Sequence, residues 1–179
     1  HESDGAVVTA AIGTASNHDV GYDPVTGIGW GRWHGGQATA NGQAVDLSQG
    51  SLHWIYGPVI DEGAAALPIT GDATYSLAGE TRPTDNAGNV GLLGSASLHA
   101  DFTSQTVFSS LAISINDQLW TASGSGDIVE GAPLFQGNYS VDAGGTSGTG
   151  GFRGFFTPPP HEGALPAGAG PSYALDNGQ

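Results

Sequence analysis

The chain has 179 residues, 31 of them glycine, and its three arginines and complete lack of lysine face 17 acidic residues, which gives a formal net charge of -14. Such a surface repels nucleic acid and anionic membranes, and a chain without cysteine has no disulfide, thiolate metal site or cysteine nucleophile. The length suits one domain, and no apolar run reaches the roughly 18 residues of a membrane helix. Because the chain begins at His1 and not at Met, we expect a processed chain or a fragment.

Short segments of alternating apolar and polar residues follow one another along the chain, separated by clusters of Gly, Asn, Asp and Pro. We assign residues 1–26 to an N-terminal extension, in which 6–12 form an extra strand or a short helix. The alternation is clearest over 92–102, where Leu92, Gly94 and Ala96 begin an apolar face that continues to Phe102. The predicted strands cover 27–36, 51–58, 71–81, 92–102, 106–115, 119–128, 134–142, 150–156 and, more weakly, 170–175.

These elements predict an all-β fold: a single eight-stranded antiparallel up-and-down β-barrel over residues 27–179, preceded by the N-terminal extension. Closure removes the exposed edges that an open sheet presents to other chains. Glycines within strands permit the tight coiling that a small barrel requires. In "GIGWGRWHGG" (27–36), one face of the strand carries glycine at every position except Trp33, and we call it the bare face. We therefore expect this face to curve or to admit a neighbouring segment.

An ordered set of segments resembles a known family. The set consists of "GWGRWHGG", "LHWIYGP", "LPITGDATYSLAGETRPT", "GLLGSASLHADFTSQTV" and "GFFTPPPHEGA", followed by "YAL". Together they resemble the C-terminal β-barrel of transferrin-binding protein B-like surface proteins, which also closes many bacterial FecR-domain proteins. The resemblance implies a secreted or outer-membrane surface domain of a Gram-negative bacterium that binds haem or an iron-carrying protein and catalyses nothing. The longer "TPPPHEGALPAGAG" segment departs from the family pattern.

Aromatic and basic side chains gather in the first two predicted strands. Trp, Tyr and Arg dominate binding hot spots, so they form a candidate patch for a planar or protein ligand. In the structural alternative, Trp30 or Trp33 plugs one end of the barrel, Arg32 or Arg153 stacks over a ring, and the glycines make room. The candidate ligand-binding residues are Trp30, Arg32, Trp33, His34, His53, Trp54 and Tyr56.

The sequence contains few signals of a metal site or of a catalytic mechanism. Haem is the cofactor that the sequence leaves open, with His34 or His53 as the axial candidate because aromatic residues surround them. No i, i+2 histidine pair and no H-E-x-x-H motif indicates a metal site. Neither a G-x-S-x-G motif nor a phosphate-binding glycine loop occurs in a suitable context, so we predict no enzyme.

Two other functions compete with ligand binding. A structural or adhesive surface module could self-assemble or bind a neighbouring protein, with residues 1–26 adding a strand to a neighbouring sheet. An outer-membrane pore requires a lipid-facing belt of large apolar residues, whereas these strands carry Ser, Thr, Gly and Ala. We rank the pore last and expect a binding domain that does not span a membrane.

Overall fold

The computed structural model describes residues 10–58, 60 and 70–178, and all regular elements among them are strands. Two three-stranded antiparallel sheets come first, β1–β4–β5 and β2–β3–β6. The strands of the first are β1 (Ala10–Ala11), β4 (Gln37–Ala40) and β5 (Gln43–Asp46). Those of the second, called here the small sheet, are β2 (Ser16–Asp23), β3 (Ile28–His34) and β6 (Ser51–Tyr56).

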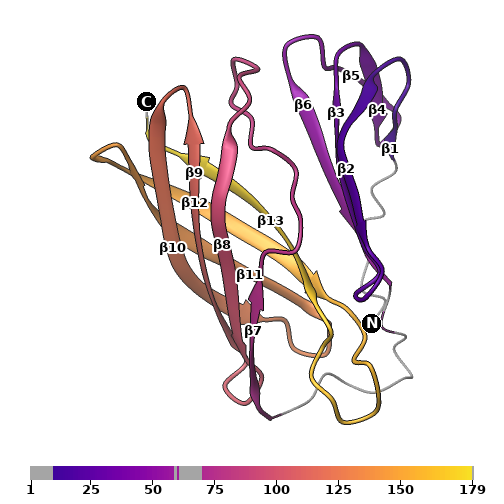
Figure 1. Ribbon diagram of the computed structural model, residues 1–179, viewed down its shortest axis with the longest axis vertical. Helices are drawn as coiled ribbons and strands as arrows, with labels where there is room; N and C mark the ends of the chain where they lie inside the picture. Colours follow the sequence, from indigo (N-terminus) through magenta and orange to yellow (C-terminus); the bar gives the residue numbers. More distant parts are fainter. Residues whose placement is uncertain (1–9, 59, 61–69, 179) are drawn as a thin grey trace.

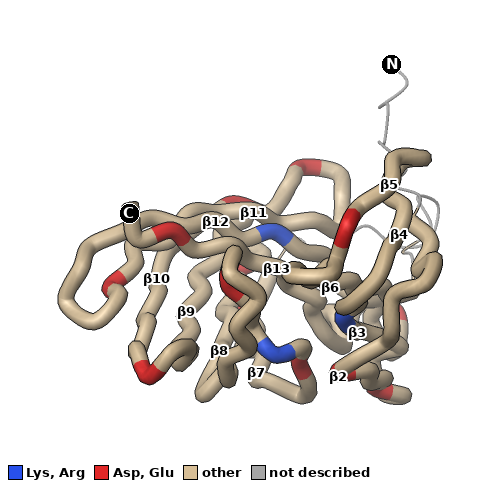
Figure 2. Tube along the Cα trace, turned by 90° about the horizontal axis from the view of Figure 1, so that it is seen from above, with Lys and Arg blue, Asp and Glu red and all other residues tan. Residues whose placement is uncertain are grey.

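The rest of the chain forms one antiparallel sheet in which strands that are consecutive in the sequence are neighbours. This sheet curls into a half-barrel, and the small sheet lies beside its open side (Figures 1 and 2). Its strands are β7 (Asp72–Ser76), β8 (Leu92–Asp101), β9 (Thr106–Ile115), β10 (Gln118–Ile128), β11 (Leu134–Ala143), β12 (Thr146–Phe156) and β13 (Ala169–Asp176).

The predicted all-β, antiparallel, curled architecture is confirmed, but a single closed eight-stranded barrel is not. Among the described residues β7 pairs with β8 alone and β13 with β12 alone, so the two edges of the half-barrel do not meet. The first two predicted strands, 27–36 and 51–58, pair with each other and with β2. Because those hydrogen bonds are made within the small sheet, they are unavailable to extend the large one.

Each predicted strand segment from residue 27 onward overlaps a strand of the structure, and β12 begins at Thr146, four residues before the predicted start. The segment 71–81 ends earlier than expected, since β7 stops at Ser76. Three strands were missed, β2, β4 and β5, of which β2 falls within the predicted N-terminal extension and pairs with β3. Most of the strand expected over 6–12 lies outside the described residues, which begin at Ala10 with β1.

The hydrophobic core fills one end of the half-barrel. Phe156 lies at its centre, with ring centroids 4.9 Å from Phe135 and 5.2 Å from Phe102. Toward the other end of the same inner face the apolar side chains of Leu93 and Trp120 are only partly buried. One end of the half-barrel is therefore packed shut by aromatic rings, while the other end remains accessible.

The bare face of β3 is covered by aromatic rings. Gly29 pairs with Tyr56 and Gly31 with Trp54, and a Cβ atom on either glycine would overlap the ring of its partner. The Tyr56 and Trp54 rings stack with centroids 5.9 Å apart. The glycines of "GIGWGRWHGG" therefore allow rings from β6 to lie flat on the sheet, which is the aromatic rescue of glycine seen between paired strands.

Candidate functional site

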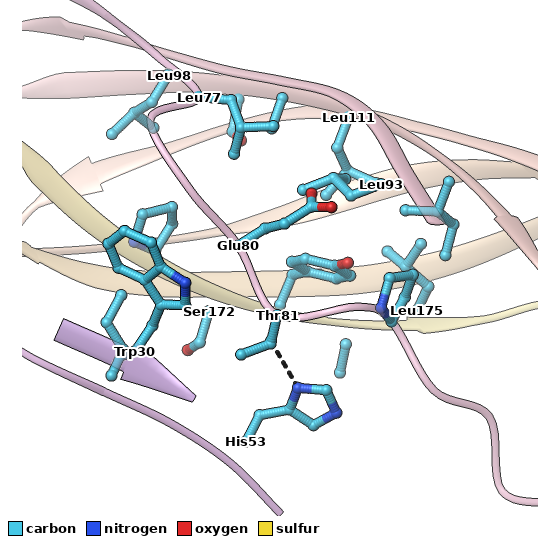
Figure 3. Close-up of a pocket in the computed structure, with 18 of the residues that line it drawn as sticks. Trp30, His53, Leu77, Glu80, Thr81, Leu93, Leu98, Leu111, Ser172 and Leu175 are labelled. Atoms are coloured by element: carbon cyan, nitrogen blue, oxygen red, sulfur yellow. Dashed lines mark hydrogen bonds between the residues drawn. The ribbon is translucent and has the colours of Figure 1, made fainter. Parts of the chain in front are cut away.

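A cavity of about 1630 Å³ lies between the inner face of the half-barrel and the small sheet. Leu93 and Leu111 from β8 and β9 line one wall, Trp120 and Leu175 extend it across β10 and β13, and Trp30 of β3 faces them (Figure 3). The curl of the large sheet turns inward the face that carries the side chains contributed by β8, β9, β10 and β13. The volume exceeds the 300 to 1,000 Å³ that is typical of ligand pockets, and the walls have the expected apolar character.

A strap of residues 77–87, between β7 and β8, lines the cavity on the side of the small sheet. Gly79 lies against the Trp30 ring so closely that a Cβ atom would overlap it. The two ring nitrogens of His53 lie 2.7 Å and 3.0 Å from the hydroxyl oxygens of Thr81 and Thr84. Burial under the strap, followed by the positive charge of Arg32, lowers the pKa of His53, so its ring is neutral at pH 7.

Asp19 connects the strap to the small sheet through two arginines. Its Oδ2 accepts a hydrogen bond from Arg32 Nε at 2.8 Å and its Oδ1 accepts one from Arg82 Nε at 3.0 Å. Arg32, which is 2% exposed, also donates to Ser51 Oγ at 2.9 Å. Burial alone would raise the pKa of Asp19, but the hydrogen bonds from the two arginines outweigh it and hold this pKa below its ordinary value.

The backbone is irregular at Asp19, the residue that pairs with the two arginines. Asp19 has a φ of +52° at a break in the register between β2 and β3, where pairing stops at His18 and resumes at Gly21. Bulges of this kind redirect a side chain out of the strand alternation. Asp is among the residues that tolerate positive φ, so its type suits both the backbone and the ion pair.

Two acidic residues of the strap, Glu80 and Asp85, line the cavity, and the Glu80 side chain points into it (Figure 3). Its Oε2 is buried and has no hydrogen-bond partner among the described residues. Burial, and then the negative charge of Asp19, raises the pKa of Glu80. Burial and the charge of Glu80 in turn raise the pKa of Tyr173 on β13. The cavity thus combines apolar walls with one carboxyl group that the fold leaves unpaired.

The structure brings together only some of the predicted ligand-binding residues. Trp30 and His53 line the cavity from one face of the small sheet, and Trp54 contributes to the lining although its ring packs on Gly31 on the other face. Trp33 lies on the opposite face of β3 from Trp30 and is not part of the cavity lining, and neither is Tyr56.

The two remaining predicted residues serve other contacts. Arg32 is held in the ion pair with Asp19 and is also outside the cavity lining. His34 Nδ1 lies 2.8 Å from the carbonyl oxygen of Gly50, and its ring meets that of His18 edge to face, with centroids 5.8 Å apart. The predicted patch is therefore divided between the cavity, a buried ion pair and the far side of the small sheet.

Several cavity residues were missed by the sequence interpretation. Glu80 fell within the predicted strand 71–81, but β7 ends at Ser76 and the structure places Glu80 in the strap, where its proximity to Tyr173 depends on the tertiary fold. Leu93 was assigned to the polar face of 92–102 and Leu92 to the apolar one, which is wrong: the register between β8 and β9 shifts between Leu93 and Ser95. This bulge leaves Leu92 61% exposed and turns Leu93 inward. Gly94 at the break was the available signal.

Within the described ranges, no group of three or more His, Cys, Asp or Glu side chains could hold a metal ion. No helix long and apolar enough to cross a membrane occurs in the part of the chain that the structure describes. Comparison of the sequence with protein-family models and with curated proteins found no match.

Proposed function

We propose that this protein is a non-enzymatic binding domain that takes a small, largely apolar molecule into the cavity between the half-barrel and the small sheet. The observation that carries the proposal is the cavity itself, with its leucine and aromatic walls. The packed core at one end supports the half-barrel, so the open end does not need to collapse to complete the fold.

The resemblance to the transferrin-binding protein B-like barrel supports the same class of function, an exported surface domain that binds a ligand. The strong acidic surface favours solubility outside the cell and suits that setting. In this proposal the half-barrel and the small sheet together do what a closed barrel does in that family: they enclose an apolar interior.

A bulky side chain added to the inner wall of the cavity should weaken binding. We expect Ala96→Phe, which places a ring beside Leu111 in the inner wall, to reduce the affinity for the uncharged fluorescent probe N-phenyl-1-naphthylamine by at least about tenfold, because the ring occupies the volume the probe needs. Ser95→Phe is the matched control, since Ser95 neighbours Ala96 in β8 but does not line the cavity. Equal binding by both variants and the unmodified protein would contradict the proposal.

The binding of haem or of an iron-carrying protein stays a prediction. A haemin titration followed at the Soret band tests the first, with His34→Ala and His53→Ala alongside. Both ring nitrogens of His53 already face threonine hydroxyls, so haem ligation by His53 requires the strap to release it. Self-assembly as a surface module is the alternative, and light scattering of the same samples measures it.

A further inference from the structure

The geometry points to an organic cation with an apolar body as the ligand of this cavity, its charged head beside the Glu80 carboxylate and its body against the leucines of β8 and β9. This inference rests on the proposed function, because it assigns the chemistry of the molecule that the cavity takes. Its starting point is the unpaired Oε2 of Glu80.

A buried carboxylate oxygen without a partner is costly, and within the described part of the chain no cation pairs with the Oε2 atom of Glu80. The protein has three arginines and no lysine. Arg32 and Arg82 are both engaged by Asp19, and Arg153 lies on β12 as an exposed residue outside the cavity lining. None of the three contributes to the raised pKa of Glu80, which follows from burial and from the charge of Asp19. A positive group on the ligand would supply the missing partner.

The histidine beside the strap does not supply this charge either. His53 is held by Thr81 and Thr84, and its lowered pKa keeps it neutral at pH 7. A ligand cation therefore meets no opposing positive charge from His53 at the strap. The net charge of -14 over the whole chain also raises the local concentration of cations relative to anions.

The walls around Glu80 suit such a ligand. Tyr75, Tyr173, Trp30 and Trp120 all line the cavity, and aromatic faces attract organic ammonium groups. The leucine side chains beyond them provide an apolar surface for an alkyl or aryl body; three of these, Leu77, Leu93 and Leu111, are shown near Glu80 in Figure 3. Asp23, Asp85 and Asp176 also line the cavity, but each accepts hydrogen bonds from the protein, so the Oε2 atom of Glu80 is the buried carboxylate oxygen that the described residues leave for a ligand.

The test compares three competitors that share one alkyl chain, each used below its micelle concentration to displace N-phenyl-1-naphthylamine. They are dodecyltrimethylammonium, dodecyl maltoside and dodecyl sulfate. We expect the cation to bind the unmodified protein at least about tenfold more tightly than the uncharged glycoside, with the sulfate weakest. Glu80→Gln should remove the preference for the cation and leave glycoside binding within about twofold. Glu130→Gln, at an exposed position outside the cavity lining, changes the net charge equally and should leave the preference intact.

Each other outcome has a defined meaning. Equal affinity for the three head groups, or a cation preference that survives Glu80→Gln, would overturn this inference and leave the cavity as a binding site for apolar molecules. Tighter binding of the sulfate would overturn it as well. If none of the molecules, including the fluorescent probe, binds the unmodified protein, the proposed function fails and this inference with it.

Discussion

Replacing Asp19 by asparagine should lower the free energy of unfolding by about 3 to 5 kcal/mol at pH 7, because it leaves the guanidinium of Arg32 buried without its counter-charge. Arg82 contributes less to this effect, since its side chain is 46% exposed and regains water. Asparagine accepts positive φ as readily as aspartate, so the backbone at φ +52° is not an additional source of strain. Denaturant unfolding followed by tryptophan fluorescence measures the loss.

Asp117→Asn is the matched control for this prediction. Asp117 also has positive φ, at +59°, but it is exposed in the turn between β9 and β10. Because the folded-state pKa of Asp19 is lowered, its stabilisation is fully present above the unfolded pKa of about 3.9 and is lost as pH falls through the lower folded value. The difference between the Asp19→Asn variant and the unmodified protein should therefore shrink below about pH 4. Equal losses in the two variants at pH 7 would contradict the role assigned to Asp19.

Gly124→Ala should destabilise the protein by about 3 kcal/mol, the upper end of the cost of overpacking. Gly124 lies on the inner face of β10, and a Cβ atom there would overlap the carbonyl oxygen of Asn138 on β11. The regular pairing of these strands is interrupted at this point, between the pairs Ser123 with Ser140 and Gly126 with Gly137. An alanine would force the two backbones apart at this position of the curled sheet.

Gly50→Ala is the control for this substitution. Gly50 has ordinary φ, and nothing lies within 4 Å of the position its Cβ atom would take, so alanine should be neutral or slightly stabilising there. Thermal unfolding of both variants measures the contrast. If Gly124→Ala and Gly50→Ala unfold together with the unmodified protein, glycine is not what permits the curl of the half-barrel.

The period-two patterns located the strands of the half-barrel because each of them has one face on the core and one in water. Along β9, Val107, Leu111 and Ile113 are buried, whereas Phe108 and Ser114 are exposed, as the alternation predicts. The patterns did not predict which strands pair. β3 and β6 have the same periodicity as the others, and the backbone pairing of β3 with β2 and β6 places them in a separate sheet. Pairing across sheets depends on long-range contacts that a local pattern does not contain.

The candidate site was predictable only where it coincides with strand aromatics. Trp30, His53 and Trp54 were singled out for their residue types and do line the cavity. Arg32 was singled out for the same reason, yet its charge is used by Asp19, a residue displaced from its strand pattern by a bulge. Glu80 could not be distinguished from the other 16 acidic residues, because its burial follows from where the strap lies in the fold.

The central claim, that ligand occupies the cavity between the two sheets, is tested most directly by the four tryptophan indole N–H signals of the ¹⁵N-labelled protein during a titration with N-phenyl-1-naphthylamine. Single Trp→Phe variants assign the signals. The rings of Trp30 and Trp120 face the cavity, whereas those of Trp33 and Trp54 lie on the other face of the small sheet. The account predicts saturable shifts of the Trp30 and Trp120 signals with one common dissociation constant, while the Trp33 and Trp54 signals move less. A titration that moves Trp33 most, or moves none of the four, would contradict it.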